Sequence, residues 1–279
     1  MNKKVIAFSL WGDNLKYTIG AIQNAKLAPQ IYPGWICRFY VANDVPSDIL
    51  QQLAAMPQVE LIYMNEAGDW RGMLWRFYAA DDSEVAIAIM RDTDSRLNLR
   101  EQAAVDEWLA SGMGIHIMRD SPLHHAAIMG GLWGARAGVL KGLRTQIKIF
   151  LHNQPTSRQG YSVDQYFLGE VIYPKIQHNA CVHDEFYEQH PFPSPRHNGE
   201  YVGEYVGING EVDKLARRFV QESLNNPTKD FAIHYFNYGK LLQTDSKRQQ
   251  EAIYCFRQAI KIKPDFAEAY DCIKSFCKD

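Results

Sequence analysis

The chain lacks an excess of charge of either sign. Its 279 residues include 30 Lys and Arg and 32 Asp and Glu, which gives a formal net charge of −2. A protein with this balance has no long-range positive field that would attract nucleic acid or an anionic membrane surface. We therefore expect no nucleic-acid partner. Any anionic ligand must be held locally, by a metal ion or by a few well-placed cationic side chains.

Cysteine is also scarce, and its pattern excludes two common uses. The five cysteines are scattered, odd in number and never arranged as Cys-x-x-Cys: Cys37, Cys181, Cys255, Cys272 and Cys277. A disulfide framework and a structural zinc site both require paired or regularly spaced cysteines. The pattern fits a protein of the reducing cytoplasm best, and the cytoplasm is the location that we predict.

Long apolar runs are absent too. No stretch approaches the roughly 20 apolar residues that span a bilayer, so we expect no transmembrane segment and at most a peripheral membrane contact. The apolar run Val5 to Trp11 follows two lysines, as in a signal peptide, but it stops at Gly12-Asp13 without a cleavage-like segment. We interpret it as part of the first β-strand of a soluble protein.

What the chain does contain is enough apolar sequence for a substantial core, since 46% of its residues are hydrophobic. Up to residue 90, short apolar runs alternate with segments of helical periodicity. The expected strands are 4–10, 37–42, 59–63 and 85–90, and the expected helices are 14–27, 47–55 and 72–80. This alternation is typical of an α/β fold with a mainly parallel, Rossmann-like sheet, in which ligands bind at the carboxyl ends of the strands.

The rest of the chain divides into a less regular region and a helical tail. After residue 100 we expect a helix at 101–110 and a strand at 115–118. A loop rich in Gly, His and Trp should follow at 122–138, and then two further helices at 140–153 and 162–172. A segment with four prolines follows, and from Val212 onward the periodicity is entirely helical. We therefore predict an α/β domain over residues 1–208 and a small all-α extension over residues 209–279.

Two aspartates directly follow the most apolar strand, at Asp92 and Asp94. Side chains at positions i and i+2 of an extended chain point the same way, so both acids can face one cleft. Together they can hold one divalent ion, because Mg²⁺ and Mn²⁺ prefer carboxylate oxygens and leave coordination positions open for phosphate. The alternative is that Asp92 caps a turn and Asp94 is solvated.

The segment Ile87 to Leu97 resembles the Asp-x-Asp strand of A-type (GT-A) glycosyltransferases. The resemblance implies sugar transfer (EC 2.4, hexosyltransferase class) from a nucleoside-diphosphate sugar, with Mn²⁺ or Mg²⁺ as the cofactor. It also implies that Asp94 is a metal ligand and that Asp92 contacts the ribose and shares the metal. In element order the resemblance covers about residues 4 to 205, but only the acid triplet and its strand are close to the family pattern. The acceptor stays open: a glycan, a lipid or a protein.

The same resemblance suggests residues for other parts of a donor site. The end of the first strand is where such enzymes hold the nucleoside, which implicates Ser9 and offers Trp11 or Tyr17 for stacking on the base. Core packing explains either aromatic side chain equally well. Members of the family often take a third metal ligand from a histidine or acid late in the domain, and His183 is the best-placed candidate.

Several arginines are candidates for neutralising phosphate charge that the metal leaves uncovered. Arg71 and Arg76 lie on the expected helix before the motif strand, and Arg91 lies beside the motif. Arg196 belongs to a late glycine-containing loop that resembles a mobile cover over the diphosphate. An ordinary linker between domains explains the same loop.

An inverting transferase also needs a carboxylate that removes the proton of the acceptor hydroxyl. The candidates are Asp120, after the strand 115–118, and Asp164, at the start of the helix 162–172. We prefer Asp164, because a helix start at the cleft is where such enzymes often bring an acceptor-binding acid; a simple helix cap is the alternative. Trp133 is either a sugar-stacking platform or a buried core residue.

The tail resembles one tetratricopeptide repeat with a residue inserted between its two helices. Large and small residues stand at the expected positions: Tyr235, Tyr238, Gly239, Leu242, Ala252, Phe256, Ala259 and Pro264. A single repeat cannot bury its own apolar face. We therefore expect it to pack on the preceding helix, on the α/β domain, or on another chain, either a protein partner or a second copy.

Two other functions compete with sugar transfer. Haloacid-dehalogenase-like phosphatases also carry Asp-x-Asp after a strand, but near the start of the chain and followed by threonine or valine where this chain has Arg96. In a non-catalytic interaction protein, the α/β domain would be a scaffold and the helical tail would bind the partner.

Overall fold

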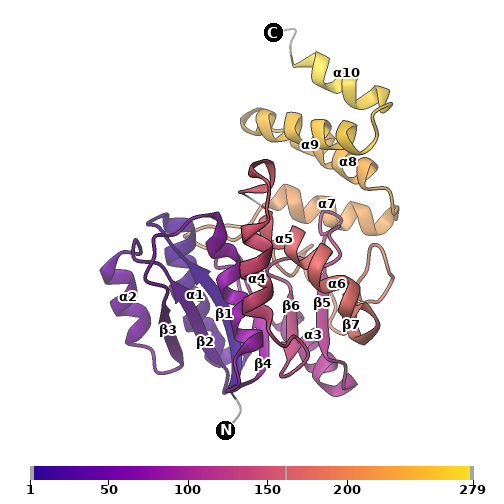
Figure 1. Ribbon diagram of the computed structural model, residues 1–279. Helices are drawn as coiled ribbons and strands as arrows, with labels where there is room; N and C mark the ends of the chain where they lie inside the picture. Colours follow the sequence, from indigo (N-terminus) through magenta and orange to yellow (C-terminus); the bar gives the residue numbers. More distant parts are fainter. Residues whose placement is uncertain (1–2, 161, 277–279) are drawn as a thin grey trace.

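The computed structural model describes residues 3–160 and 162–276 (Figure 1). Its centre is a seven-stranded sheet with the order β3-β2-β1-β4-β6-β5-β7. The strands are β1 (Lys3–Leu10), β2 (Ile36–Val41), β3 (Val59–Tyr63), β4 (Val85–Met90), β5 (Ile115–Arg119), β6 (Trp133–Arg136) and β7 (Ala180–Asp184). Neighbouring strands run parallel, except that β6 is antiparallel to β4 and β5. The predicted fold class, α/β with a mainly parallel sheet, is confirmed.

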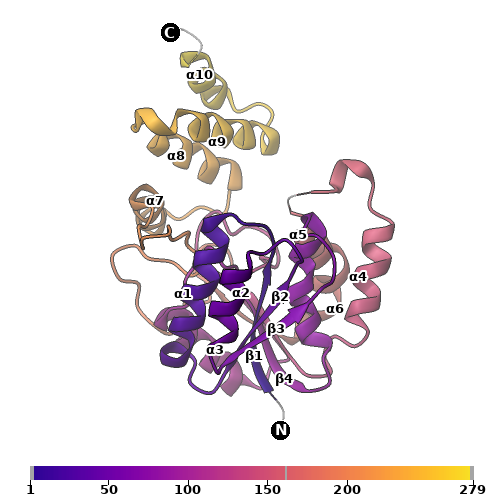
Figure 2. The same ribbon diagram turned by 90° about the vertical axis from the view of Figure 1, so that its left-hand side faces the viewer.

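Helices cover both faces of this sheet (Figures 1 and 2). One face carries α1 (Leu15–Ile31), α2 (Ser47–Ala54) and α3 (Leu99–Ser111). The other carries the 3₁₀ helix η1 (Trp70–Asp81), α4 (Leu143–His152), α5 (Val163–Phe167), the π-helical turn η3 (Leu168–Ile172) and α6 (Tyr173–Ile176). Single 3₁₀ turns are η2 (Thr156–Arg158), η4 (Gln177–Asn179) and η5 (Ser246–Arg248). Because both faces are covered, every residue of β1 from Val5 to Leu10 is buried.

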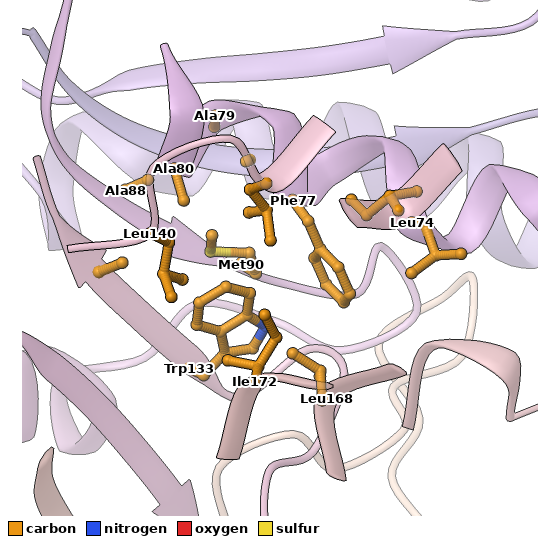
Figure 3. Packing of buried hydrophobic residues seen from close by; sticks show 14 of the residues in the cluster. Leu74, Phe77, Ala79, Ala80, Ala88, Met90, Trp133, Leu140, Leu168 and Ile172 are labelled. Carbon is orange, nitrogen blue, oxygen red and sulfur yellow. The ribbon is translucent and has the colours of Figure 1, made fainter. Parts of the chain in front are cut away.

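The apolar layer between the sheet and η1, α4 and α5 is centred on Trp133 (Figure 3). Its indole is fully buried among Met90, Leu168 and Ile172, and it meets Phe77 edge-on at 5.2 Å. Such edge-to-face contacts add to the stabilisation that burial alone provides. The structure therefore shows that Trp133 is a core residue, and the alternative prediction that it is a sugar-stacking platform is wrong.

Two strands lie in segments where the sequence predicts none. β6 falls within the predicted loop 122–138, and β7 includes His183, which the sequence predicts only as a metal ligand. Both are short, and each pairs with a strand far away in the sequence, β6 with β4 and β7 with β5. Strand formation that depends on such distant partners leaves little local signal. The helix predicted at 72–80 is the 3₁₀ helix η1, which begins where the Asp69 carboxylate accepts from the N–H of Arg71.

The C-terminal helices are α7 (Lys214–Asn225), α8 (Phe231–Leu242), α9 (Gln249–Ile262) and α10 (Ala267–Ser275). They rise from the end of the α/β body opposite the N-terminus (Figures 1 and 2). α8 and α9 pack closely where Gly239 faces Phe256, since a Cβ on this glycine would lie 2.8 Å from the ring. Leu123 and Tyr201 pack against the apolar cluster of these helices. The tail therefore packs on α7 and on the α/β body, whereas the boundary at 208/209 stays a prediction.

Two further observations concern residues 3–160 and 162–276. No helix in these ranges is long and apolar enough to cross a membrane. Four cysteines carry free thiols: Cys37, Cys181, Cys255 and Cys272. Cys277 lies outside the described residues.

Candidate active site

The strand order creates a crevice between the ends of β1 and β4. From β1 the chain proceeds outward to β2 and β3, and then returns to β4 on the opposite side of β1. In an open α/β sheet, ligands bind at such a reversal point, outside the carboxyl ends of the two strands. Here these ends supply Ser9, Leu10 and Trp11 from β1, and Asp92, Thr93 and Asp94 after β4.

A cavity of about 240 Å³ occupies this crevice. Its walls come from the two strand ends, from α1, η1 and α5, from the loop between β5 and β6, and from the segment before α7. The lining residues are Ser9, Leu10, Trp11, Tyr17, Met73, Arg76, Asp92, Thr93, Asp94, His124, Met129, Gly130, Gly131, Leu132, Ser162, Asp164, Gln165 and Gly203. The fold thus brings together these predicted site residues: Ser9, Trp11, Tyr17, Arg76, Asp92, Asp94 and Asp164.

Asp92 and Asp94 both line the cavity, and so does Thr93 between them, because the chain turns at Thr93 and Asp94 instead of continuing extended. Each carboxylate also meets one cation. Asp92 pairs with Arg76, and its side chain remains 46% exposed. Asp94 Oδ2 lies 2.7 Å from Nζ of Lys16, near the start of α1. This combination suits a phosphate-bearing ligand, because the carboxylates can hold a metal ion while the cations contact phosphate oxygens.

Arg76 connects the side of the cavity that carries Asp92 with the side that carries Asp164. Its backbone N–H donates to Ser9 Oγ at 3.0 Å, which fixes η1 against β1. Its guanidinium lies between two carboxylates: Nη1 donates to Asp92, and Nη2 donates to Asp164 Oδ2 at 2.9 Å. Burial raises the pKa of Asp164, and the charge of Arg76 opposes this rise. A carboxyl group with a raised pKa at a cleft is a candidate general base.

Two glycines let the loop before β6 lie directly against these acids. A Cβ on Gly130 would be 2.0 Å from Asp164 Oδ2, and one on Gly131 would be 1.9 Å from Asp92 Oδ2. Any side chain at either position would therefore collide with a carboxylate. Glycine allows the backbone to close one wall of the cavity at van der Waals contact.

Trp11 and Tyr17 line the β1 side of the cavity and are half-buried. The indole of Trp11 packs edge-on against Trp75 at 6.2 Å. The ring of Tyr17 faces Nζ of Lys16 at 4.9 Å. Since both rings are partly accessible, stacking on a nucleotide base stays a prediction for each of them.

Arg91 does not line the cavity. Neighbouring residues of an extended chain point to opposite sides, so Arg91 points away from Asp92. Its buried guanidinium donates to Glu101 Oε1 at 3.1 Å and to the carbonyls of Met90 and Trp133 at 2.8 and 3.3 Å. The predicted phosphate contact of Arg91 is therefore wrong. Strand alternation is the sequence signal that indicates the inward direction of this side chain.

Asp120 and Arg196 belong to a buried ion-pair network beside the cavity. Asp120 accepts from Arg100 at 2.8 and 2.9 Å, from Arg196 Nη2 at 2.6 Å and from the N–H of Val202 at 2.9 Å. Arg196 also pairs with Glu185 at 2.9 Å. These groups already satisfy one another, which corrects the predicted roles of Asp120 as a base and of Arg196 as a diphosphate ligand. The network instead anchors the segment before α7.

His183 does not line the cavity either. Its Nδ1 lies 2.9 Å from Nε2 of His116 on β5, and its Nε2 lies 3.6 Å from Glu107 on α3. These contacts correct the predicted role of His183 as a third metal ligand. Among the described residues, no group of three or more His, Cys, Asp or Glu side chains is arranged to hold a metal ion. Asp92 and Asp94 remain the ligands that we predict.

Some residues at the site were not predicted. Lys16, which pairs with Asp94, carries a signal in retrospect, because a helix that follows β1 begins at the same end of the sheet as the Asp-x-Asp segment. His124 and Met129 carry none. They lie in a loop whose path depends on β6, and β6 itself forms through long-range pairing.

The sequence matches no protein-family model and no curated protein. Similar solved structures include a glycosyltransferase involved in the glycosylation of the major capsid of PBCV-1, with 12% identity, 80% of this chain and 99% of that chain covered, and a TM-score of 0.45. TarS residues 1–349 of S. aureus has 12% identity, coverages of 98% and 89%, and a TM-score of 0.43. The mannosyltransferase PcManGT of Pyrobaculum calidifontis, in complex with GDP-Man and Mn²⁺, has 12% identity, coverages of 99% and 76%, and a TM-score of 0.40.

Proposed function

We propose that this protein is a metal-dependent glycosyltransferase that moves a sugar from a nucleoside-diphosphate sugar to a hydroxyl of a glycan, lipid or protein. The observation that carries the proposal is the convergence of Asp92, Asp94 and Asp164 in one cavity. That cavity lies at the β1–β4 crevice, where open α/β sheets bind nucleotides. The resemblance of the Asp-x-Asp segment to A-type glycosyltransferases points to the same reaction class.

A divalent cation fits the donor set at the β4 end of the cavity. Asp92 and Asp94 offer partly exposed carboxylate oxygens, which are the ligands that Mg²⁺ and Mn²⁺ prefer. These two side chains would hold the ion, which when bound offsets the negative charge of the donor diphosphate. Lys16 and Arg76, each paired with one of the two acids, are placed to contact phosphate oxygens.

Asp164 is the proposed base for an inverting transfer. Its carboxylate accepts the proton of the acceptor hydroxyl while that oxygen bonds to the anomeric carbon and the diphosphate leaves. The base must be ionised for this step. Arg76 Nη2, 2.9 Å from Asp164 Oδ2, favours the ionised form and fixes the orientation of the carboxylate.

Metal-dependent nucleotide binding tests the proposal. Thermal unfolding is measured with UDP, GDP, ADP and CDP, each with and without Mn²⁺. A ligand at 100 times its dissociation constant stabilises the folded state by ~2.7 kcal/mol, so binding is visible as a higher unfolding temperature. Asp94→Ala should abolish the Mn²⁺-dependent stabilisation and leave the fold intact. Asp48→Ala, at an exposed position of α2, is the matched control and should bind like the wild type.

The competing functions give different outcomes. A non-catalytic scaffold would show no release of nucleoside diphosphate from any sugar nucleotide, even if the nucleotide binds. A phosphatase would release inorganic phosphate from phosphate monoesters and would lose this activity in Asp92→Asn. Failure of all four nucleotides to bind, with or without Mn²⁺, contradicts the proposal.

A further inference from the structure

His124 is a polar cavity residue to which the proposed reaction assigns no role. It lies in the loop between β5 and β6, and its ring lines the cavity and packs edge-on against Tyr201 at 5.9 Å. The backbone N–H of Asp120 donates to His124 Nδ1 at 3.1 Å. A backbone N–H can only donate, so Nδ1 must carry a lone pair. In the neutral ring, the hydrogen therefore resides on Nε2.

The surroundings keep this ring neutral and its Nε2–H available. Burial lowers the pKa of His124 to about 3, and the charges of His125, Arg196 and Arg119 act in the same direction, against Asp92. Among the described residues, Nε2 of His124 has no hydrogen-bond partner. This nitrogen is not fully buried, since it does not belong to the buried side-chain polar atoms without a partner. His124 therefore brings to the lining of the cavity a neutral ring whose N–H is not engaged by a described residue.

The C-terminal helices hold the loop that carries His124. Leu123 packs against the apolar cluster of α8 and α9. His125 lies 4.9 Å from the ring of Phe231, and its Nε2 lies 3.2 Å from the hydroxyl of Tyr235 on α8. Side chains on either side of His124 thus contact the tail, whereas His124 itself lines the cavity. A displacement of α8 would move the loop and change the position of the donor.

We propose that His124 binds the donor substrate by donating a hydrogen bond from Nε2–H to an oxygen of its diphosphate or its sugar, and that α8 positions it through Leu123 and His125. This inference rests on the proposed glycosyltransferase function, because it takes the cavity as the donor site. The ligand atom must be an oxygen acceptor, since Nε2–H can only donate.

Two substitutions separate the roles of the two ring nitrogens. His124→Asn keeps an acceptor near the position of Nδ1 for the Asp120 N–H but lacks a donor at the position of Nε2. His124→Gln places an amide N–H near the position of Nε2. With Mn²⁺ present, His124→Asn should bind about three- to tenfold more weakly, the factor that one neutral hydrogen bond contributes. His124→Gln should regain part of this affinity.

The titrations use whichever of UDP, GDP, ADP or CDP binds in the panel, and its glucose conjugate. Weaker binding of both ligands by His124→Asn places the acceptor oxygen on the diphosphate, and weaker binding of the conjugate alone places it on the sugar. His178→Asn, at an exposed histidine of η4, is the control and should bind both ligands like the wild type. Unfolding midpoints equal to that of the wild type show that the loss is local.

Unchanged affinity of His124→Asn for both ligands overturns the proposal. If the wild-type protein binds neither ligand, the proposed function itself fails, and this outcome is distinct from the first. His125→Ala tests the positioning role of the tail, because it removes the contacts with Phe231 and Tyr235 without altering the cavity lining. It should weaken binding as well, and an unchanged affinity would overturn the part of the proposal that concerns α8.

Discussion

Nη2 of Arg76 donates to Asp164 Oδ2 at 2.9 Å, and the same guanidinium pairs with Asp92. One buried cation therefore links the proposed metal-binding acid and the proposed base. A buried charge is costly without partners, so the guanidinium and the two carboxylates hold one another in place. The metal end and the acceptor end of the cavity should consequently respond to the same substitution.

Replacing Arg76 with Met should move the acid limb of the activity profile to higher pH. Burial raises the pKa of Asp164, and Arg76 is the main group that lowers it. Removal of the guanidinium therefore raises this pKa further. Because the base must be ionised, activity should be lost at a higher pH as the solution is acidified. The measurement is kcat/KM for release of nucleoside diphosphate from the sugar nucleotide, between pH 4 and 8.

Arg76→Lys serves as the control for this prediction. It keeps a positive charge beside Asp164, so its acid limb should be displaced less than that of Arg76→Met. Unfolding midpoints are compared in parallel, because both variants alter a buried ion pair. An acid limb at the same pH in the wild type and in Arg76→Met would remove Asp164 from the role of base.

Asp164→Asn should lower kcat by about 10²–10⁴-fold, the range that a general base contributes. The amide has nearly the same size as the carboxyl group and can still accept from Arg76, so binding of the nucleoside diphosphate should be unchanged. Asp94→Ala is the comparison, since it should lose binding instead. Steady-state kinetics and calorimetric titration together separate the two effects. Full turnover in Asp164→Asn would contradict the assignment.

Gly131→Ala should impair nucleotide binding without unfolding the protein. The new Cβ would lie 1.9 Å from Asp92 Oδ2, so either the carboxylate or the loop must move. Gly169→Ala is the matched control, because a Cβ on Gly169 would meet no atom within 4 Å and this glycine has a helical backbone. The control should bind normally, and its free energy of unfolding should rise by about 0.5–1 kcal/mol. Equal nucleotide affinity of the two variants would show that Asp92 is not fixed by this contact.

The sequence predicts the fold best where the signal is local. Strand Val85–Met90 has its predicted bounds, because burial on both faces of a parallel sheet produces a continuous apolar run. Asp92 and Asp94 do line one cavity, but through a turn at Thr93 and Asp94 and not through the alternation of an extended chain. In contrast, strand Trp133–Arg136 contains a glycine and an arginine and is defined by its pairing with β4 and β5.

The candidate site follows the same division. Asp120, Arg196 and His183 are polar residues in suitable parts of the sequence, but distant partners determine where their side chains point. Arg100 and Arg196 surround Asp120, and His116 occupies one nitrogen of His183. Side chains from separate elements meet only once the chain is folded, so spacing along the sequence cannot distinguish a buried ion pair from a ligand-binding group.

Asp120→Ala should lower the free energy of unfolding by about 3–5 kcal/mol, because Arg100 and Arg196 would lose a fully buried partner. Glu170→Ala is the comparison, since it breaks an exposed pair with Arg158 at 2.7 Å and should change the free energy by no more than about 1 kcal/mol. Denaturant unfolding measures both values. A small effect at Asp120 would show that the network is dispensable for stability.

Deletion of residues 228–279 should destabilise the protein and weaken nucleotide binding. The deletion removes α8, α9 and α10 and uncovers Leu123 and Tyr201, which pack against them. New apolar surface of this kind promotes association, so the truncated protein should aggregate or unfold at a lower temperature. The loop with His124 also loses its contacts to α8, whereas Asp92 and Asp94 keep theirs. Mn²⁺-dependent binding should therefore persist with reduced affinity in the soluble fraction. Light scattering, thermal unfolding and calorimetric titration provide the three measurements. A truncated protein that is monodisperse, equally stable and equal in affinity would instead identify the tail as an independent module, whose exposed helices serve a partner rather than the cavity.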